Sequence, residues 1–312
     1  MGGGGCLNAS IDLLVGTPRR RRKERAVRAL LRTAALASLA VSVAIIAALA
    51  GQAVVWLTRI DLGALWGQGW FPRQGEFDVP TLVVGTVMVA GIAMLGAAPL
   101  GLGAAVYLSE YASPHMRRVL KPVLETLAGI PSVVLGYFAL TVIQPELVQR
   151  LFTTRTGAFS FMAAGIAVGI LTVPLVASVA EDALFAVPRA LREAAYAIGA
   201  RRSAVAIRVT IPAAISGIVA SLILGLSRAI GETMVVAIAA GATGQAQRTF
   251  DPLSGGQTMT GAISSLAIGS DQVKGSDLAF GSLYFVGLLL FVVTFALNVV
   301  SERYVRRVRK AY

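Results

Sequence analysis

Long apolar runs separated by short polar stretches are the main pattern in this 312-residue sequence. A helix needs about 20 mostly apolar residues to cross the hydrocarbon core of a bilayer. Gly and Pro inside such runs do not exclude them, because membrane helices tolerate both residues. The pattern predicts an all-α, polytopic membrane protein with six transmembrane helices, at about 33–57, 80–107, 123–144, 160–180, 211–241 and 278–300.

Basic residues alternate between the segments that connect these helices. Of the 28 Lys and Arg residues, 21 fall in the N-terminal tail, the second and fourth loops and the C-terminal tail, six fall in the other three loops, and Arg228 lies inside a span. Cytoplasmic loops of membrane proteins are enriched in Lys and Arg. The sequence therefore predicts cytoplasmic termini, a disordered basic N-tail (1–32), a transmembrane domain (33–302) and a basic C-tail (303–312).

Composition supports the membrane assignment and excludes several other classes. The chain is 56% hydrophobic and 14% charged, whereas soluble domains are about one quarter charged. The net charge of +12 is explained by the basic loops, so we expect no nucleic-acid partner. With one Cys, one His and no GxxxxGK[ST] phosphate-binding loop, we expect no metal site, no catalytic residue and no cofactor in this chain.

The loop between the fourth and fifth spans predicts a helix–turn–helix elbow at 188–208. Pro188 suits the first position of a helix, and the run REAAYA that soon follows consists mostly of strong helix formers. Gly199 offers a turn, a second helix follows, and Pro212 begins the next span. A flat surface of small residues could dock into a groove of a partner, and an ordinary amphipathic loop is the alternative. This surface consists of Glu193, Ala194 and Ala195.

The elbow resembles the EAA motif of ABC-importer permeases. That motif reads Glu-Ala-Ala, three residues, Gly, nine residues and Ile-x-Leu-Pro; here it ends in Val209-Thr210-Ile211-Pro212, with two branched apolar replacements. Other parts of the chain, within about 80–300, are similar to permeases of phosphate-type importers. These parts are AGIPSVVLGYFAL (128–140), VPLVASVAEDALFAVPRALREAAYAIGA (173–200) and GLSRAIGETMVV (225–236).

The resemblance implies a type I, MetI-like permease fold in a bacterial cell membrane. It implies a subunit that moves inorganic phosphate and couples to a separate ATPase, which holds ATP and Mg, through Glu193, Ala194, Ala195, Gly199 and Pro212. The implied partners are a homologous permease, two ATP-binding subunits and an extracytoplasmic phosphate-binding protein that docks partly on 242–277. The alternatives are an ABC permease for another oxyanion, such as molybdate or sulfate, and a secondary transporter that works without an ATPase.

Arg228 and Glu232 place two opposite charges inside the fifth span. A charge at the centre of a membrane helix costs about 2.5–3.5 kcal/mol, and i, i+4 spacing predicts that the two lie on one helix face, close enough to pair. They could form a structural ion pair, or they could line an anion path in which the guanidinium binds phosphate oxygens. The resemblance places them at the translocation path. The residues expected there are Arg228, Glu232, Ser227 and Thr233, with Gly225 and Gly231 leaving room for an oxyanion.

Four further expectations concern local structure. As one helix, 212–241 would be about 45 Å long, which exceeds a hydrocarbon core of about 30 Å, so it must tilt, break or protrude. Residues 258–269 favour a short amphipathic or re-entrant helix over a plain loop. Glu181 and Asp182 are expected to be solvated at the membrane interface. An interfacial aromatic belt is expected from Trp56, Trp66, Trp70 and Phe71.

Overall fold

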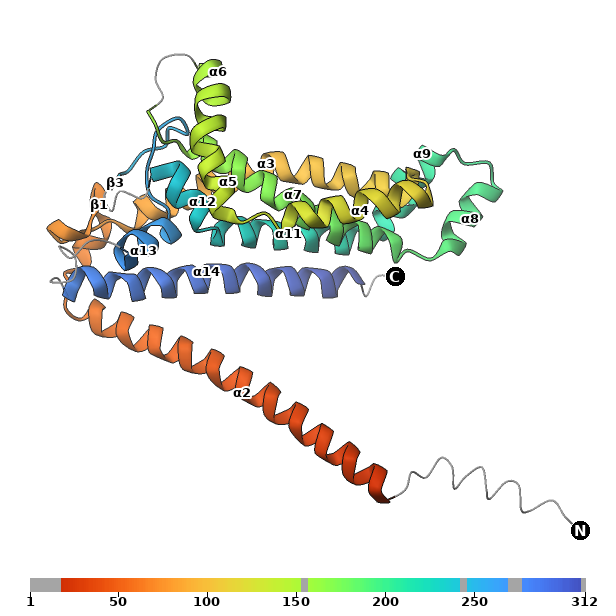
Figure 1. Ribbon diagram of the computed structural model, residues 1–312, viewed down its shortest axis with the longest axis horizontal. Coiled ribbons are helices and arrows are strands. Elements are labelled where there is room, and N and C mark those ends of the chain that lie inside the picture. The colour runs from red at the N-terminus through yellow and green to blue at the C-terminus, as the bar shows by residue number, and fades with distance from the viewer. Residues whose placement is uncertain (1–17, 153–156, 242–245, 269–276, 310–312) are drawn as a thin grey trace, which may run out of the picture. The chain divides into compact units, whose positions relative to one another are not determined.

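The computed structural model describes residues 18–152, 157–241, 246–268 and 277–309 (Figure 1). The chain divides into two compact units, Met1–Gly51 and Gln52–Tyr312. Five helices are long and apolar enough to cross a membrane, and a pair bent by 72° would make a sixth span. Each of the six predicted spans overlaps one of these segments, so the helical membrane fold is confirmed. The segments are Arg22–Leu57, Val79–Tyr111, Ser132–Phe152, Phe161–Phe185, Leu278–Arg303 and the bent pair Arg202–Ala213 with Ile215–Gly231.

The first long helix, α2 (Pro18–Leu57), contains the Arg-rich segment that precedes the first apolar run. We expected 1–32 to be a disordered tail, but 18–32 is helical. Beyond Pro18 this segment contains no Gly or Pro, and Arg, Lys, Glu, Ala and Leu are good helix formers. The helix therefore continues from the basic segment into the apolar span without a break, and residues 1–17 lie outside the described residues.

The core of the unit Gln52–Tyr312 is formed by α3 (Val79–Val106) and α7 (Phe161–Phe185), which pack along each other. Glycines allow the close approach: a Cβ at Gly165 would lie 2.6 Å from Cβ of Ile92. Two more helices, α11 (Ile215–Gly231) and α14 (Asp277–Arg309), run alongside, with α11 touching α3, α7 and α14. Figure 1 shows this bundle with α8 and α9 at one end and β1, β3 and α13 at the other.

The third span begins later than the sequence predicted. Residues 114–128 form a separate amphipathic helix, α4 (Pro114–Ala128), which ends at Gly129. Pro131 then precedes α5 (Ser132–Phe138) and a π-helical stretch, Ala139–Gln149, that runs into α6 (Arg150–Phe152). The span is therefore 132–152 rather than 123–144, because a residue before Pro is driven out of the helical region and the chain turns there.

The predicted fifth span, 211–241, is broken in two places. A short α10 (Ile211–Ala213) is followed by a non-helical residue, Ala214, and α11 then runs to Gly231. After a second break come α12 (Met234–Val236) and the π-helical Ala237–Gly241. We expected this long segment to tilt, break or protrude, and the structure shows that it breaks.

A small sheet lies at the end of the bundle away from α8. Strand β1 (Gly69–Phe71) pairs antiparallel with β2 (Glu76–Phe77) and with β3 (Ala246–Gln247). Two short 3-10 helices, Leu62–Trp66 and Pro72–Gln74, belong to the same region. The sheet connects the first and fifth loops, which are far apart in the sequence.

Arg248 strengthens this connection. Its Nη2 donates to Oδ1 of the buried Asp78 at 2.6 Å and to the Gly67 carbonyl at 2.9 Å. The nearby α13 (Met259–Ile268) confirms the short helix expected at 258–269. The backbone N–H of its first residue, Met259, donates a hydrogen bond to Oγ1 of Thr86 on α3 at 2.9 Å.

Only one of the three tryptophans fits the expected aromatic belt. Trp56 and Trp70 are buried and pack with Phe77, at ring distances of 5.0 and 5.9 Å. Trp66 is 76% exposed. Trp70 is buried within β1, and Trp56, near the end of α2, packs against Phe77 of β2.

Candidate functional site

The elbow between α7 and α11 has the helix–turn–helix form that the sequence predicted. Helix α8 (Arg189–Ala197) begins directly after Pro188, and α9 (Arg202–Val205) continues through the π-helical Ala206–Thr210 into α10. Gly199 has φ +81°, a conformation that costs other residues roughly 1–2 kcal/mol. It therefore reverses the chain between the two arms.

The docking surface predicted on α8 is open. Glu193 and Ala194 are exposed, whereas Ala195 is 9% exposed and faces the inside of the elbow. Two of the three expected surface residues are thus accessible to a partner, and the third is buried. Pro212, the last residue of the motif, lies in α10 just before the bend.

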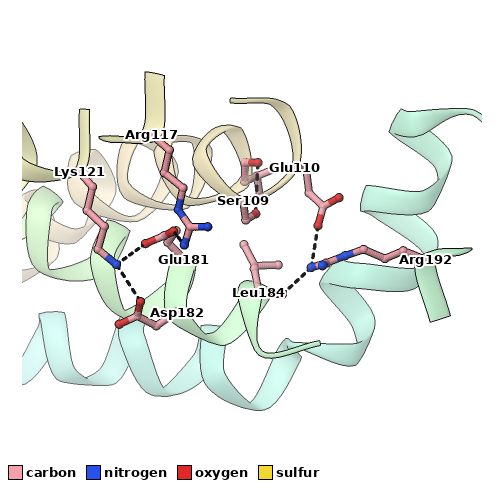
Figure 2. Close-up of polar contacts among 9 residues, drawn as sticks. Ser109, Glu110, Arg117, Lys121, Glu181, Asp182, Leu184 and Arg192 are labelled. Carbon is pink, nitrogen blue, oxygen red and sulfur yellow. Dashed lines mark hydrogen bonds and ion pairs between the residues drawn. The ribbon is translucent and has the colours of Figure 1, made fainter. Parts of the chain in front are cut away.

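Arg192, the residue before this motif, fastens α8 to the helix bundle (Figure 2). Its Nη2 donates to the backbone carbonyl of Leu184 at 2.7 Å and lies 3.1 Å from Oε1 of Glu110. Leu184 is near the end of α7, and Glu110 lies in a π-helical stretch, Tyr107–Tyr111, that extends α3. One guanidinium nitrogen therefore holds the elbow against two spans.

A second charged cluster ties α4 to α7, as Figure 2 also shows. Glu181 is fully buried and pairs with Arg117 and with Lys121, whose Nζ donates to it at 2.8 Å. Lys121 also donates to Asp182 at 3.0 Å. The expectation that both acids are solvated is wrong for Glu181, because α4 covers it; the Asp182 side chain is 66% exposed. The pKa of Lys121 is raised, mainly by the hydrogen bond to Glu181. Burial lowers it by less than this, and the hydrogen bond to Asp182 raises it further.

Arg228 and Glu232 do not share a helix face. Arg228 is in the last turn of α11, but the helix ends at Gly231 and Glu232 is extended, with φ −68° and ψ 129°. Among the described residues, no hydrogen bond or ion pair reaches the exposed guanidinium of Arg228. The prediction that the two charges are stacked at i, i+4 is therefore wrong, since the chain leaves the helix between them.

The break at Glu232 is held by α13. The hydroxyl of Thr260 donates to the backbone carbonyl of Glu232 at 2.7 Å. The Glu232 carboxylate turns toward the following residue and accepts from the Thr233 N–H at 3.2 Å. Broken helices at membrane depth need such partners for the freed backbone groups. The short helix thus stabilises an unwound turn next to Arg228.

The other residues predicted at this site have mixed surroundings. Ser227 is half-buried and its hydroxyl donates to Oδ1 of Asn298 on α14 at 3.4 Å, and Thr233 donates to the Gly231 carbonyl at 3.3 Å. Open space lies beside Gly231, where an added Cβ would meet no atom within 4 Å. Gly225 instead packs against Val176, which a Cβ would approach to 2.7 Å. The segment is therefore open beside Gly231 and closely packed beside Gly225.

The apolar helices and the helix–turn–helix elbow define a helical membrane protein. Residues 97–310 match the family described as binding-protein-dependent transport system inner membrane component, and the chain belongs to this family. The described part of the chain contains no group of three or more His, Cys, Asp or Glu residues that could hold a metal ion.

Similar proteins carry more specific names. The chain is 30% identical over 264 residues to the phosphate transport system permease protein PstC of Pasteurella multocida, covering 79% of this chain and 80% of that protein. It is 29% identical over 281 residues to PstC of Xylella fastidiosa (80% and 85% covered). It is 32% identical over 243 residues to the probable ABC transporter permease protein YqgH of Bacillus subtilis (77% and 76% covered).

Solved structures confirm the fold. An inward-facing MetNI methionine ABC transporter matches with a TM-score of 0.55 at 20% identity, over 73% of this chain and 96% of that one. A bacterial alginate ABC transporter matches with a TM-score of 0.52 at 16% identity, over 73% of this chain and 78% of that one. The expected MetI-like permease fold is therefore confirmed.

Sequence reasoning did not single out Glu110 or Arg192. Their contact depends on two segments that are distant in the chain, and a glutamate after an apolar run looks like any other interfacial residue. One signal was present in the sequence: Arg192 directly precedes the three motif residues Glu193, Ala194 and Ala195, and a basic residue next to the motif was a candidate for pairing with an acidic side chain.

Proposed function

We propose that this chain is a permease subunit of an ATP-driven importer of inorganic phosphate. It pairs with a homologous permease, and two ATP-binding subunits hold the ATP and Mg and bind the elbows. An extracytoplasmic binding protein delivers phosphate at the opposite end of the bundle. The chain itself carries out no covalent chemistry; both termini and the elbow lie in the cytoplasm.

The observation that carries this proposal is the similarity, over about four fifths of the chain, to proteins named as phosphate transport permeases. The geometry of the elbow supports the same assignment. Its exposed face, with Glu193 and Ala194, suits a groove on a partner, and the sequence has no nucleotide-binding loop of its own. A division of labour between a permease and a separate ATPase explains both features.

We further propose that Arg228 belongs to the phosphate path. Its guanidinium is exposed and, among the described residues, unpaired. A guanidinium binds phosphate oxygens through paired, charge-assisted hydrogen bonds. The open space at Gly231 and the hydroxyls of Ser227 and Thr233 lie along the same short segment. Glu232 completes the set as an acceptor for a phosphate hydroxyl.

The experiment is phosphate uptake into proteoliposomes that contain the complete complex, the binding protein and internal ATP. Arg228→Gln keeps a polar side chain but removes the charge and the guanidinium fork. We expect assembly and ATP hydrolysis to persist and uptake to fall by at least about tenfold, which corresponds to roughly 1.4 kcal/mol. Arg25→Gln removes an exposed arginine from the basic first part of α2 and is the matched control, expected to transport like the parent.

Four other results would change the assignment. Normal uptake by Arg228→Gln removes this residue from the path. A complex that no longer assembles makes Arg228 a structural residue at the permease interface. Competition in which molybdate or sulfate displaces phosphate at equal concentration indicates a permease for another oxyanion, and uptake that needs no ATP indicates a secondary transporter.

A further inference from the structure

Both arms of the elbow contact the same short stretch at the end of α3. On the α8 side, Arg192 pairs with Glu110 at 3.1 Å. On the α9 side, the guanidinium carbon of Arg202 lies 5.4 Å from the ring centroid of Tyr111. Glu110 and Tyr111 are adjacent residues of the π-helical Tyr107–Tyr111. The end of α3 is therefore the place where the two arms meet the bundle.

The pair between Arg192 and Glu110 is shielded from solvent. Its side chains are 16% and 4% exposed, whereas the side chains of the i, i+4 pair Arg150 and Glu146 are 73% and 54% exposed. Charges that are removed from water interact more strongly than exposed ones, and their geometry is fixed by the atoms around them. Because the same nitrogen of Arg192 also binds the Leu184 carbonyl at 2.7 Å, α8 cannot move away from α7 or α3 without breaking this contact.

The π-helical geometry of Tyr107–Tyr111 is the second notable feature. Such stretches are rare, and they occur frequently at functional sites. Here the stretch ends a 28-residue helix, α3, that packs along α7 for most of its length. A displacement applied at Glu110 would therefore act on the long helix that forms half of the core.

We propose that Glu110 and Arg192 are positioning residues that transmit the motion of the elbow to α3, with Tyr111 and Arg202 as the second contact. Along the chain, the elbow is connected only to α7 on one side and, through α10, to α11 on the other. The Glu110 contact adds α3 as a third helix. The elbow then drives α3 and α7 as one body. This inference rests on the proposed coupling to an ATPase, and it concerns the route of coupling rather than the transported anion.

A double-mutant cycle in the reconstituted complex tests the proposal. The variants are Glu110→Gln, Arg192→Gln and the two combined, and the readout is the number of anions imported per ATP hydrolysed, alongside assembly. Each single change is expected to lower this ratio at least about fivefold, the lower end of typical coupling between sites. The double variant is expected to lose no more than either single variant, because residues that act as a unit are not additive.

Two further variants sharpen the test. Arg192→Lys keeps the positive charge beside Glu110 and a donor for the Leu184 carbonyl, so it should retain most of the parent ratio. Glu146→Gln removes an exposed ion pair elsewhere and should leave the ratio unchanged. A purely structural role would lower the amount of assembled complex and leave the ratio of the recovered complex at the parent value.

The proposal is overturned if Glu110→Gln and Arg192→Gln assemble and keep the parent ratio, or if their losses add in the double variant. If neither single variant assembles into a complex, the test is repeated with Tyr111→Leu and Arg202→Gln. The proposal is again overturned if both of these variants import as many anions per ATP as the parent. The ratio is measured with whichever anion the parent complex imports. A parent that imports molybdate instead of phosphate would thus contradict the proposed substrate and leave this test intact.

Discussion

At the scale of single residues, the buried acidic side chains of the described residues are all held by basic partners. Glu181, Glu110 and Asp78 are all buried, and each is paired with a basic residue. A buried carboxylate without a partner is strongly unfavourable, which explains these pairs. Arg228 in the fifth span differs from them, since its guanidinium is exposed and, among the described residues, has no partner. An unpaired charge in an apolar segment is expected to serve a ligand.

Lys121 leads to a prediction about pH. Because its hydrogen bond to Glu181 raises its pKa in the folded state, the stabilisation is complete below the unfolded pKa of about 10.4. It is lost as the pH rises through the higher folded value. We therefore expect the thermal stability of the parent to fall, as the pH rises above about 10.4, more steeply than that of Lys121→Arg, which stays charged there. Identical pH profiles would show that this ion pair does not stabilise α4 against α7.

At the scale of elements, small residues decide how closely the helices approach. Glycines on α7 meet α3 where any side chain would collide, whereas several glycines on the outer faces meet nothing. Close packing between membrane helices is driven by van der Waals contact and is favoured by small residues. The contact between α3 and α7 therefore depends on which face each glycine occupies, and not on how many glycines there are.

Gly165 and Gly91 give a matched comparison. In Gly165→Ala the new Cβ would lie 2.6 Å from Ile92, and we expect a net loss of about 1–2 kcal/mol, because overpacking costs about 1–3 kcal/mol and alanine returns up to about 1 kcal/mol of helix propensity. Gly91→Ala meets no atom within 4 Å and should be neutral or stabilising. Unfolding in detergent, followed by circular dichroism, measures both. Equal stability of the two variants would show that α3 and α7 are less closely packed than described.

At the scale of the whole molecule, the bundle has two different ends. The elbow, with its arginines, lies at one end and the small sheet with α13 lies at the other (Figure 1). The excess of basic residues at the elbow end indicates the cytoplasm. An even number of crossings would place both termini on that side.

Cysteine labelling tests this orientation. With Cys6→Ser as the background, Ser113→Cys reports on the elbow end, before α4, and Glu76→Cys reports on the sheet. Both positions are exposed. An impermeant maleimide should label position 76 in right-side-out vesicles and position 113 only in inside-out vesicles, with permeabilised vesicles labelling both. The reverse pattern would invert the topology and exclude an elbow that binds a cytoplasmic ATPase.

The sequence predicted the elements whose signal is local. Six apolar runs, the reversal at Gly199 and the short helix α13 follow from residues that are neighbours in the chain. The third span was misplaced because α4 continues the apolar pattern up to Gly129, and periodicity alone cannot distinguish an amphipathic surface helix from the start of a span. The relation of Arg228 to Glu232 was misjudged for a similar reason, since helical spacing has no meaning once the helix ends at Gly231.

Hydrophobicity and turn chemistry act over a few residues, so the chain's local pattern was enough to predict the class of the molecule: a six-span helical membrane protein with a helix–turn–helix elbow. The tertiary structure alone decided which charges are buried, where the fifth span breaks and how the elbow is fastened. Lys121 and Glu181 are 60 residues apart in the chain, and Thr260 and Glu232 are 28 apart. Such contacts depend on how whole helices pack, and packing is settled by all of their side chains together rather than by any one segment.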